Sequence, residues 1–169
     1  MDNQSCCFFG HRKIEDTEKL RLKLSTTIER LIIDEKIDTF FFGSKSQFDS
    51  ICHEIITNLK EKYTYIKRIF VRAEYPFIDE KYTTYLLENY EDTYFPDHMI
   101  KAGKASYVER NFEMIDKSRV CVVFYNPDYA PPRRRASNNF LTDYQPKSGT
   151  KIAYEYAIKK KKTIINIAE

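Results

Sequence analysis

The strongest constraint on the fold is an apolar, β-branched run from Arg119 to Tyr125 (RVCVVFY). Apolar residues at successive positions fill both faces of a strand, and such strands belong to parallel sheets that helices cover. The segments Cys6 to Gly10 (CCFFG) and Ile37 to Gly43 (IDTFFFG) have the same character. The sequence therefore predicts buried strands of a mainly parallel sheet.

Segments with helical periodicity separate these strands. Apolar residues recur there at three- and four-residue spacing, which is typical of amphipathic helices. The predicted helices are 20–32, 48–59, 79–94, 104–118 and 149–160, and the further predicted strands are 66–71 and 163–167. This alternation predicts an α/β fold, a Rossmann-like three-layer sandwich with a mainly parallel sheet and helices on both faces.

Composition fits one globular domain over residues 1–169. With 42% apolar and 31% charged residues, the chain is neither disordered nor fibrous. A net charge of +3 is too small to indicate a nucleic-acid binder. No apolar run approaches the about 18 residues of a membrane span, and no signal-peptide pattern opens the chain, so we expect a cytoplasmic protein without a membrane partner.

Cysteine and histidine usage points away from a metal site. The four cysteines and three histidines are scattered without the spacing that zinc ligands need. We therefore expect buried, reduced thiols, no metal and no cofactor.

Glycines mark several predicted strand–helix junctions. Gly10 and Gly43 close predicted strands, and Gly149 opens a predicted helix. In a parallel sheet such junctions gather at the carboxyl edge, where open α/β folds bind ligands. Glycine allows close backbone approach, and helix N-termini offer N–H groups to anions, so the junctions predict a nucleotide-like, phosphate-bearing ligand. Their polar neighbours are the other candidate ligand-binding residues: His11, Arg12, Ser44, Ser148 and Thr150.

Two further residues near these junctions have more than one interpretation. Asp49 would lie on the first turn of the helix after Gly43. One interpretation is that it stabilises the helix start, and the other is that it contacts a ribose hydroxyl or acts in catalysis. His11 is a candidate phosphate partner or general acid, although a lone histidine in a turn usually has neither role.

Segments at the start (CCFFGHR), middle (SYVERNFEMIDKSRVCVVFYN) and end (SGTKIAYEYAIKKKKTIINI) of the chain carry a family resemblance. They resemble the bacterial SLOG superfamily, the Rossmann-like group named for Smf and lonely-guy proteins, and within it a small family of stand-alone proteins that begin with Phe-Gly-His-Arg. The resemblance spans nearly the whole chain. It implies a parallel sheet flanked by helices that binds nucleotides, nucleotide-derived signals or, in the Smf branch, single-stranded DNA.

Residue by residue, the resemblance implies two ligand contacts. The stretch 108–114 is similar to a helix motif of lonely-guy phosphoribohydrolases, in which Arg110 has the position of an active-site arginine. The alternative is that Arg110 forms a surface ion pair with Glu109 or Glu113. Ser148-Gly149-Thr150 is similar to the Gly-Gly-x-Gly-Thr turn that receives the ligand phosphate, with one glycine missing, and Tyr156-Ala157 is spaced from it as in nucleoside deoxyribosyltransferases.

The main departure from these enzymes is a missing glutamate. Both enzyme families place a catalytic glutamate two or three residues past the Gly-Thr pair, where this chain has Ile152 and Ala153. Glu155 is two residues past Ala153 and therefore lies about 200° further round the helix than Ala153. It is expected to pair with Lys151 and Lys159, which are four residues away on either side. Asp116 and Glu113 are expected to be solvated surface acids, so whether the protein is an enzyme stays open.

Three functions compete. The first is binding or sensing of a nucleotide-like ligand without catalysis, and the second is cleavage of a nucleotide N-glycosidic bond with Asp49 or Glu155. The third is single-stranded nucleic-acid binding by Arg133–Arg135 and stacking tyrosines. It is not favoured, because most of the 13 tyrosines and 12 phenylalanines lie at core spacing.

The connection 126–147 is predicted to be a mobile basic flap over the ligand edge. Resemblance to dimeric superfamily members makes a homo-oligomer a further hypothesis.

Overall fold

A computed structural model describes residues 3–43, 45–100, 104–129 and 149–169, which form a six-stranded sheet and five helices. The strands are β1 (Ser5–Gly10), β2 (Thr39–Phe42), β3 (Lys67–Val71), β4 (Asp92–Tyr94), β5 (Val120–Phe124) and β6 (Thr163–Asn166). The helices are α1 (Glu18–Ile33), α2 (Gln47–Leu59), α3 (Glu80–Leu87), α4 (Lys104–Lys117) and α5 (Gly149–Lys159). The α/β prediction is confirmed.

All neighbouring strands are parallel, in the spatial order β4-β3-β2-β1-β5-β6. The chain builds outward from β1 to β4, then returns to place β5 on the other side of β1. In register, Cys7 of β1 pairs with Phe41 of β2 and with Cys121 of β5. The strand order thus reverses between β1 and β5, the place where open α/β sheets bind ligands outside the carboxyl ends.

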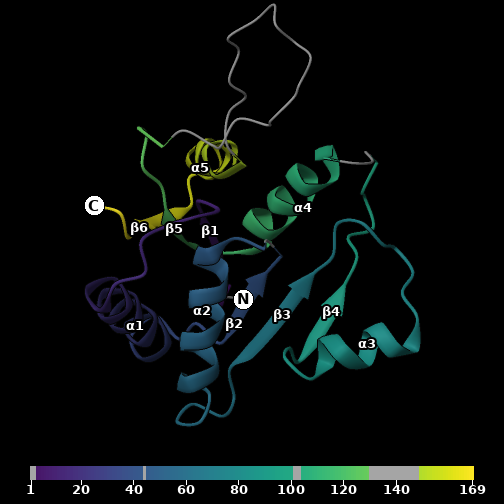
Figure 1. Cartoon of the computed structure of the whole chain (residues 1–169), viewed down its shortest axis with the longest axis horizontal. Coiled ribbons are helices and arrows are strands. Elements are labelled where there is room, and N and C mark those ends of the chain that lie inside the picture. Colours follow the sequence, from purple (N-terminus) through teal and green to yellow (C-terminus); the bar gives the residue numbers. More distant parts are fainter. Residues whose placement is uncertain (1–2, 44, 101–103, 130–148) are drawn as a thin grey trace, which may run out of the picture.

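Helices cover both faces of this sheet (Figure 1), which confirms the three-layer sandwich. Alternate residues of β1 face opposite cores: Cys6 and Phe8 pack with α1 and α2, whereas Cys7 and Phe9 pack with α4 and α5. The central strands are buried on both faces, as their continuous apolar sequences predict. All four cysteines are buried free thiols, also as predicted.

Side-chain caps explain where the helices begin. Thr17 accepts a hydrogen bond from the Leu20 amide at the start of α1, and Ser46 accepts one from Asp49 at the start of α2. Each cap satisfies an amide that has no partner within its helix. Because each helix follows a parallel strand, the capped starts face the carboxyl edge of the sheet.

The tyrosine-rich segment 79–94 departs from the prediction of a single helix. Its helix α3 ends at Leu87, and residues Asp92–Tyr94 form the edge strand β4. The cause is Glu91, whose carboxylate accepts hydrogen bonds from both the amide and the guanidinium of Arg68, at 2.7 and 2.9 Å. The Glu91 amide also donates to the Arg68 carbonyl, at 2.8 Å. These contacts hold the segment against β3, so the prediction is wrong for its last residues.

In the part of the chain that the structure describes, no helix is long and apolar enough to cross a membrane. The same residues contain no group of three or more potential metal-ligating side chains.

Candidate functional site

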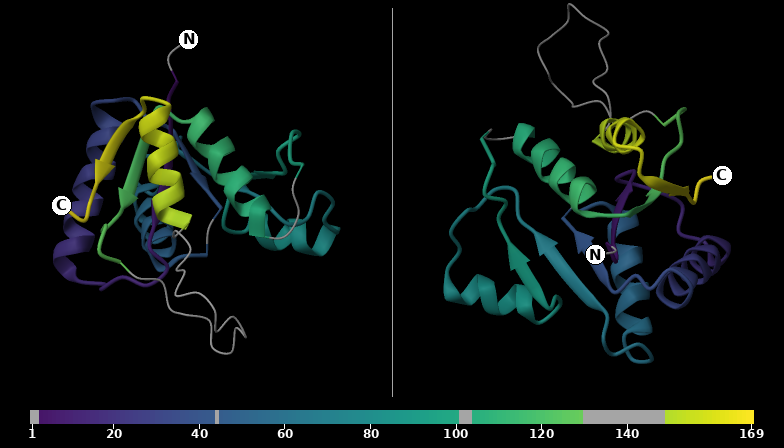
Figure 2. Two further views of the ribbon diagram at one scale, coloured as in Figure 1. Left: turned by 90° about the horizontal axis from the view of Figure 1, so that it is seen from above. Right: turned by 180° about the vertical axis from the view of Figure 1, so that it is seen from behind.

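The predicted ligand-binding residues gather at the carboxyl edge of the sheet. Gly10, His11 and Arg12 end β1 and begin the next connection, and Gly43 follows β2. Gly149 and Thr150 open α5, which begins at the end of the molecule toward which the β5 and β6 arrows point (Figure 2, left). Ser44 and Ser148 lie outside the described residues, as do residues 130–147 of the predicted basic flap 126–147. A common cavity for the edge residues stays a prediction.

Two of the three edge glycines are explained by packing. A Cβ atom on Gly10 would lie 2.3 Å from the Cβ of Phe48, and one on Gly43 would lie 2.7 Å from the Cδ of Arg110. The lack of a side chain at Gly10 therefore lets α2 pack directly on the end of β1, and the lack of one at Gly43 lets α4 pack on the end of β2. Gly149 differs, because no described atom lies within 4 Å of a Cβ placed there.

Arg110 is a buried cation on α4, held against the end of β2. Its side chain is 5% exposed, and its Nη1 donates a hydrogen bond to the Gly43 carbonyl. The Nε donates to Asn111 at 3.2 Å, and the guanidinium lies 5.4 Å from the centre of the Tyr107 ring. Arg110 thus lies at the predicted edge, but the alternative of a solvated surface pair is wrong because the side chain is buried.

The buried Asp49 compensates the charge of Arg110. Burial lowers the pKa of Arg110 to about 10, while the negative charges of Asp49 and Glu74 oppose that change. Asp49 is 3% exposed on the first turn of α2, where its amide donates to Ser46 Oγ at 3.1 Å. These observations support the helix-start role of Asp49 and add a partnership with Arg110 that the sequence did not indicate. A contact with ribose or a catalytic role stays a prediction.

Glu113 was expected to be a solvated acid, and that prediction is wrong. It is 7% exposed on the side of α4 that faces β4. Its carboxylate lies 3.2 Å from Lys117 Nζ and 3.4 Å from His98 Nε2, and it accepts a hydrogen bond from the Tyr94 hydroxyl at 3.4 Å. These partners hold the Glu113 carboxylate between α4 and β4, which gives it a structural role.

Asp116 and Glu155 are exposed, as the sequence predicts. Asp116 is exposed and accepts a hydrogen bond of 2.8 Å from the Tyr156 hydroxyl. Glu155 is exposed on α5, whereas Ala153, where the resemblance to the enzymes leads one to look for a glutamate, is buried. The predicted pairing of Glu155 with lysines stays a prediction.

His11 is more deeply buried than sequence reasoning indicated. Its ring is 2% exposed and stacks on Tyr129, with ring centres 3.9 Å apart and planes 13° from parallel. The Asn126 amide donates to His11 Nε2 at 2.8 Å, and burial lowers the pKa of the imidazole. No local pattern indicates this burial, because the residues that cover His11 come from the end of β5 and the turn that follows it.

Exposed cations surround this junction. Arg12 and Lys13 follow β1, and Lys45 precedes α2; all three side chains are exposed. The Gln47 amide donates to the Arg12 carbonyl at 2.9 Å, and the Gln47 side chain accepts from the Ile14 amide at 3.0 Å. These bonds join the two loops, so the three cations belong to one continuous surface at the carboxyl edge.

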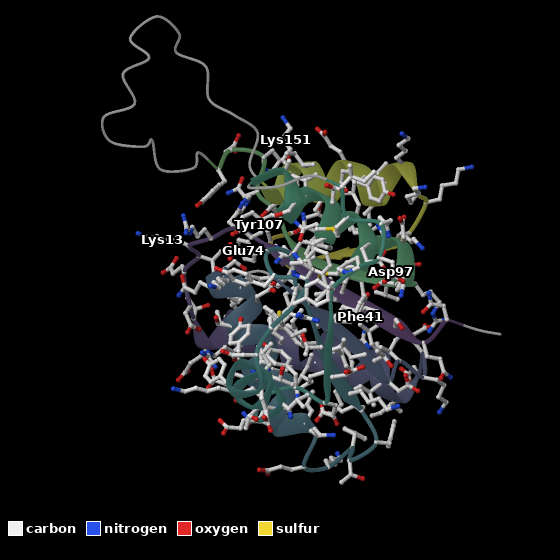
Figure 3. The ribbon with its side chains drawn as sticks, turned by 90° about the vertical axis from the view of Figure 1, so that its right-hand side faces the viewer. Lys13, Phe41, Glu74, Asp97, Tyr107 and Lys151 are labelled. Atoms are coloured by element: carbon white, nitrogen blue, oxygen red, sulfur yellow. The ribbon has the colours of Figure 1, made fainter. Side chains whose placement is uncertain are left out.

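Aromatic side chains extend this surface beyond β3 and onto α4. Tyr75 and Phe77 are 57% and 92% exposed, and Tyr107 is 37% exposed. Figure 3 shows Tyr107 toward the same side of the picture as Lys13 and Lys151, with Asp97 on the other side. The edge therefore offers both cations and flat apolar rings.

Comparison with known proteins supports the fold. No family model and no curated protein sequence matches the chain significantly. The structure is similar to the X-ray structure of DNA processing protein A (DprA) from Streptococcus pneumoniae, with 13% identity and a TM-score of 0.53, covering 93% of this chain and 48% of that one. It is also similar to DNA processing protein A from Helicobacter pylori, whose structure concerns its single-stranded DNA binding mode. That match has 16% identity and a TM-score of 0.57, and it covers 96% of this chain and 64% of the Helicobacter pylori chain.

The chain thus spans less than two thirds of either protein. At such low identity the likeness shows the fold alone, which is Rossmann-like.

Proposed function

We propose that the carboxyl edge of the sheet binds a phosphate-bearing nucleotide unit without chemical turnover. The observation that carries this proposal is the joined pair of loops with exposed Arg12, Lys13 and Lys45, next to the strand-order reversal. Cations beside a helix start are a favourable environment for a phosphate, because both supply positive potential.

The charges on this surface are available to a ligand. Within the described residues, no acidic side chain forms an ion pair with Arg12, Lys13 or Lys45, whereas Asp16 on the same connection is paired with Arg21 at 2.7 Å. Arg110 has a different role, since its buried charge is offset by Asp49 and directed at the Gly43 carbonyl. The three exposed cations favour an anion at this edge.

The acids of the edge support binding rather than cleavage. At the positions where related glycosidic enzymes have a glutamate, α5 has Ile152 and Ala153, and Glu155 is exposed. Asp49 lies on the first turn of α2, where its negative charge offsets the positive charge of the buried Arg110, which favours a structural role for this carboxylate over a catalytic one.

A second candidate ligand is single-stranded nucleic acid. The exposed rings of Tyr75, Phe77 and Tyr107 favour it, because successive bases stack on aromatic side chains while cations contact the backbone. The similarity to DNA processing protein A adds support at the level of the fold. Both candidates place phosphates on the same cations.

Binding assays separate these candidates. Adenosine 5′-monophosphate and a ten-nucleotide oligodeoxythymidylate would be titrated by calorimetry and fluorescence anisotropy, with base release followed by chromatography. We expect binding without base release, and at least tenfold weaker binding by the Arg12→Gln/Lys13→Gln/Lys45→Gln variant. The matched control is Lys36→Gln, near the amino edge. A steep fall of affinity with salt for the oligonucleotide alone would favour the second candidate. Absence of binding by both probes, or release of base, would refute the proposal.

A further inference from the structure

His11 lies at the junction where the strand order reverses. The preceding residue, Gly10, pairs in register with Phe124 of β5, so His11 follows β1 directly beside the end of β5. The imidazole contacts the rings of Phe124 and Tyr125, with centres 6.3 and 5.9 Å away, and stacks on Tyr129 at 3.9 Å. A histidine enclosed by three aromatic rings is held in one orientation.

The contacts of His11 determine which ring nitrogen carries the proton. The Asn126 amide donates to Nε2 at 2.8 Å, so that nitrogen must keep its lone pair. Burial lowers the pKa of the imidazole, so the ring is neutral at pH 7. A neutral imidazole with an unprotonated Nε2 has its proton on Nδ1.

This Nδ1–H group has no hydrogen-bond partner among the described residues, although it is buried. Buried donors are rarely left unpaired, because losing water without a replacement is unfavourable. The unpaired Nε atoms of Arg72 and Arg119 are less telling, since both guanidinium groups donate through other nitrogens. The neutral His11 ring has one donor, and that donor lacks an acceptor in the part of the chain that the structure describes.

Tyr129 covers the ring of His11 from a short turn. The Asp128 amide donates to the Asn126 side chain at 2.9 Å, and the Tyr129 amide donates to the Asn126 carbonyl at 3.0 Å. The turn contacts His11 through one amide and one stacked ring. A planar ring already occupies the face of the imidazole in nearly parallel stacking, the geometry that a nucleobase adopts on an aromatic side chain.

We infer that His11 is the base-contacting residue of the carboxyl edge and that Tyr129 is its internal competitor. This inference rests on the proposed function. A nucleobase replaces the Tyr129 ring on the face of His11, the Nδ1–H donates to an oxygen of the same nucleotide unit, and the phosphate lies toward Arg12 and Lys13. Without ligand, Tyr129 closes the position.

The variant Tyr129→Ala tests this competition. It removes the competing ring, so adenosine 5′-monophosphate or the oligodeoxythymidylate should bind about three- to tenfold more tightly, the range that one ring–ring contact sets. Tyr65→Ala is the matched control, because Tyr65 is exposed and precedes β3 at the amino edge. His11→Phe, which keeps a ring but lacks the donor, should bind at least tenfold more weakly than the unaltered protein.

The outcomes distinguish this inference from the proposed function. If the unaltered protein binds a probe but Tyr129→Ala binds no more tightly, the inference is wrong and the proposed function stands. If neither protein binds a probe, both fail. Nitrogen-15 spectra of labelled histidine give a readout that requires no ligand: a protonated Nδ1 and unprotonated Nε2 at pH 7 are expected, and the reverse tautomer would overturn the inference even if binding occurs.

Discussion

Alanine substitution of the edge glycines tests the packing of the site, and Gly43→Ala is the most informative change. The added Cβ would lie 2.7 Å from Cδ and 2.8 Å from Nε of Arg110, and 3.0 Å from Sδ of Met114. Overpacking of this kind costs about 1–3 kcal/mol. A displaced guanidinium also loses its hydrogen bond to the Gly43 carbonyl, and a hydrogen bond to a charged group contributes about 1.5–3 kcal/mol. Because the two effects overlap, we expect the free energy of unfolding to fall by about 2–4 kcal/mol.

Gly10 and Gly149 provide the matched comparisons. In Gly10→Ala the new atom would lie 2.3 Å from the Cβ of Phe48, which no rotamer change can move, so the loss should be about 3 kcal/mol or more. In Gly149→Ala the new atom meets no described neighbour, and alanine exceeds glycine in helix propensity by up to about 1 kcal/mol. That variant should be as stable as the unaltered protein or slightly more stable.

Urea unfolding followed by far-ultraviolet circular dichroism measures all three variants. The expected order of stability is Gly149→Ala above Gly43→Ala above Gly10→Ala. A Gly43→Ala protein as stable as the unaltered one would refute the fixed position of Arg110 against β2. A loss of more than about 2 kcal/mol in Gly149→Ala would refute the open surroundings of the α5 start.

Three further measurements address protonation and catalysis. Burial lowers the pKa of both His11 and His53, so below the ordinary value of 6.5 the unfolded chain binds protons that the native state does not. The free energy of unfolding should therefore fall from pH 7 to pH 5. An unchanged slope of the unfolding free energy against pH in His11→Gln would contradict this. Burial acts to raise the pKa of Glu91, but hydrogen bonds from Arg68 and Lys60 outweigh it and set the value at about 2. Glu91→Gln should therefore lose about 1–2 kcal/mol at pH 7, and the deficit should shrink as the pH falls from 4.5 toward 2; a constant deficit would contradict the pairing. Glu155→Ala should change nucleotide binding by less than about 1 kcal/mol, whereas turnover present in the unaltered protein and lost in this variant would overturn the non-catalytic interpretation.

The sheet was predictable where its strands are buried on both faces. In β1 and β5 every interior position is apolar, so the pattern alone identifies them as central strands. The edge strand β4 was not predictable in this way, because its three residues Asp92–Tyr94 carry no apolar pattern. It forms because the Arg68–Glu91 contacts hold the segment beside β3, and such contacts join residues 23 positions apart.

The candidate site was predictable in its location but not in its internal contacts. Gly10, Gly43 and Asp49 were identified because they follow strands, and parallel topology brings strand ends to one edge. The burial of Arg110 depends on a contact with Gly43, which is 67 positions away. The burial of His11 depends on Asn126, which is 115 positions away. Local periodicity carries no information on contacts of this length.

The same contacts change the meaning of the glycines. The sequence predicts the same role for Gly10, Gly43 and Gly149, that of letting the backbone approach a ligand. The structure shows that Gly10 makes room for Phe48 and Gly43 for Arg110, so these two would be required in a protein that bound nothing. Gly149 is exposed at a helix start, and no described side chain lies where its Cβ would be. A loss of ligand binding in Gly149→Ala with unchanged stability would therefore report on the ligand itself, whereas the same loss in the other two would report first on the packing of α2 and α4.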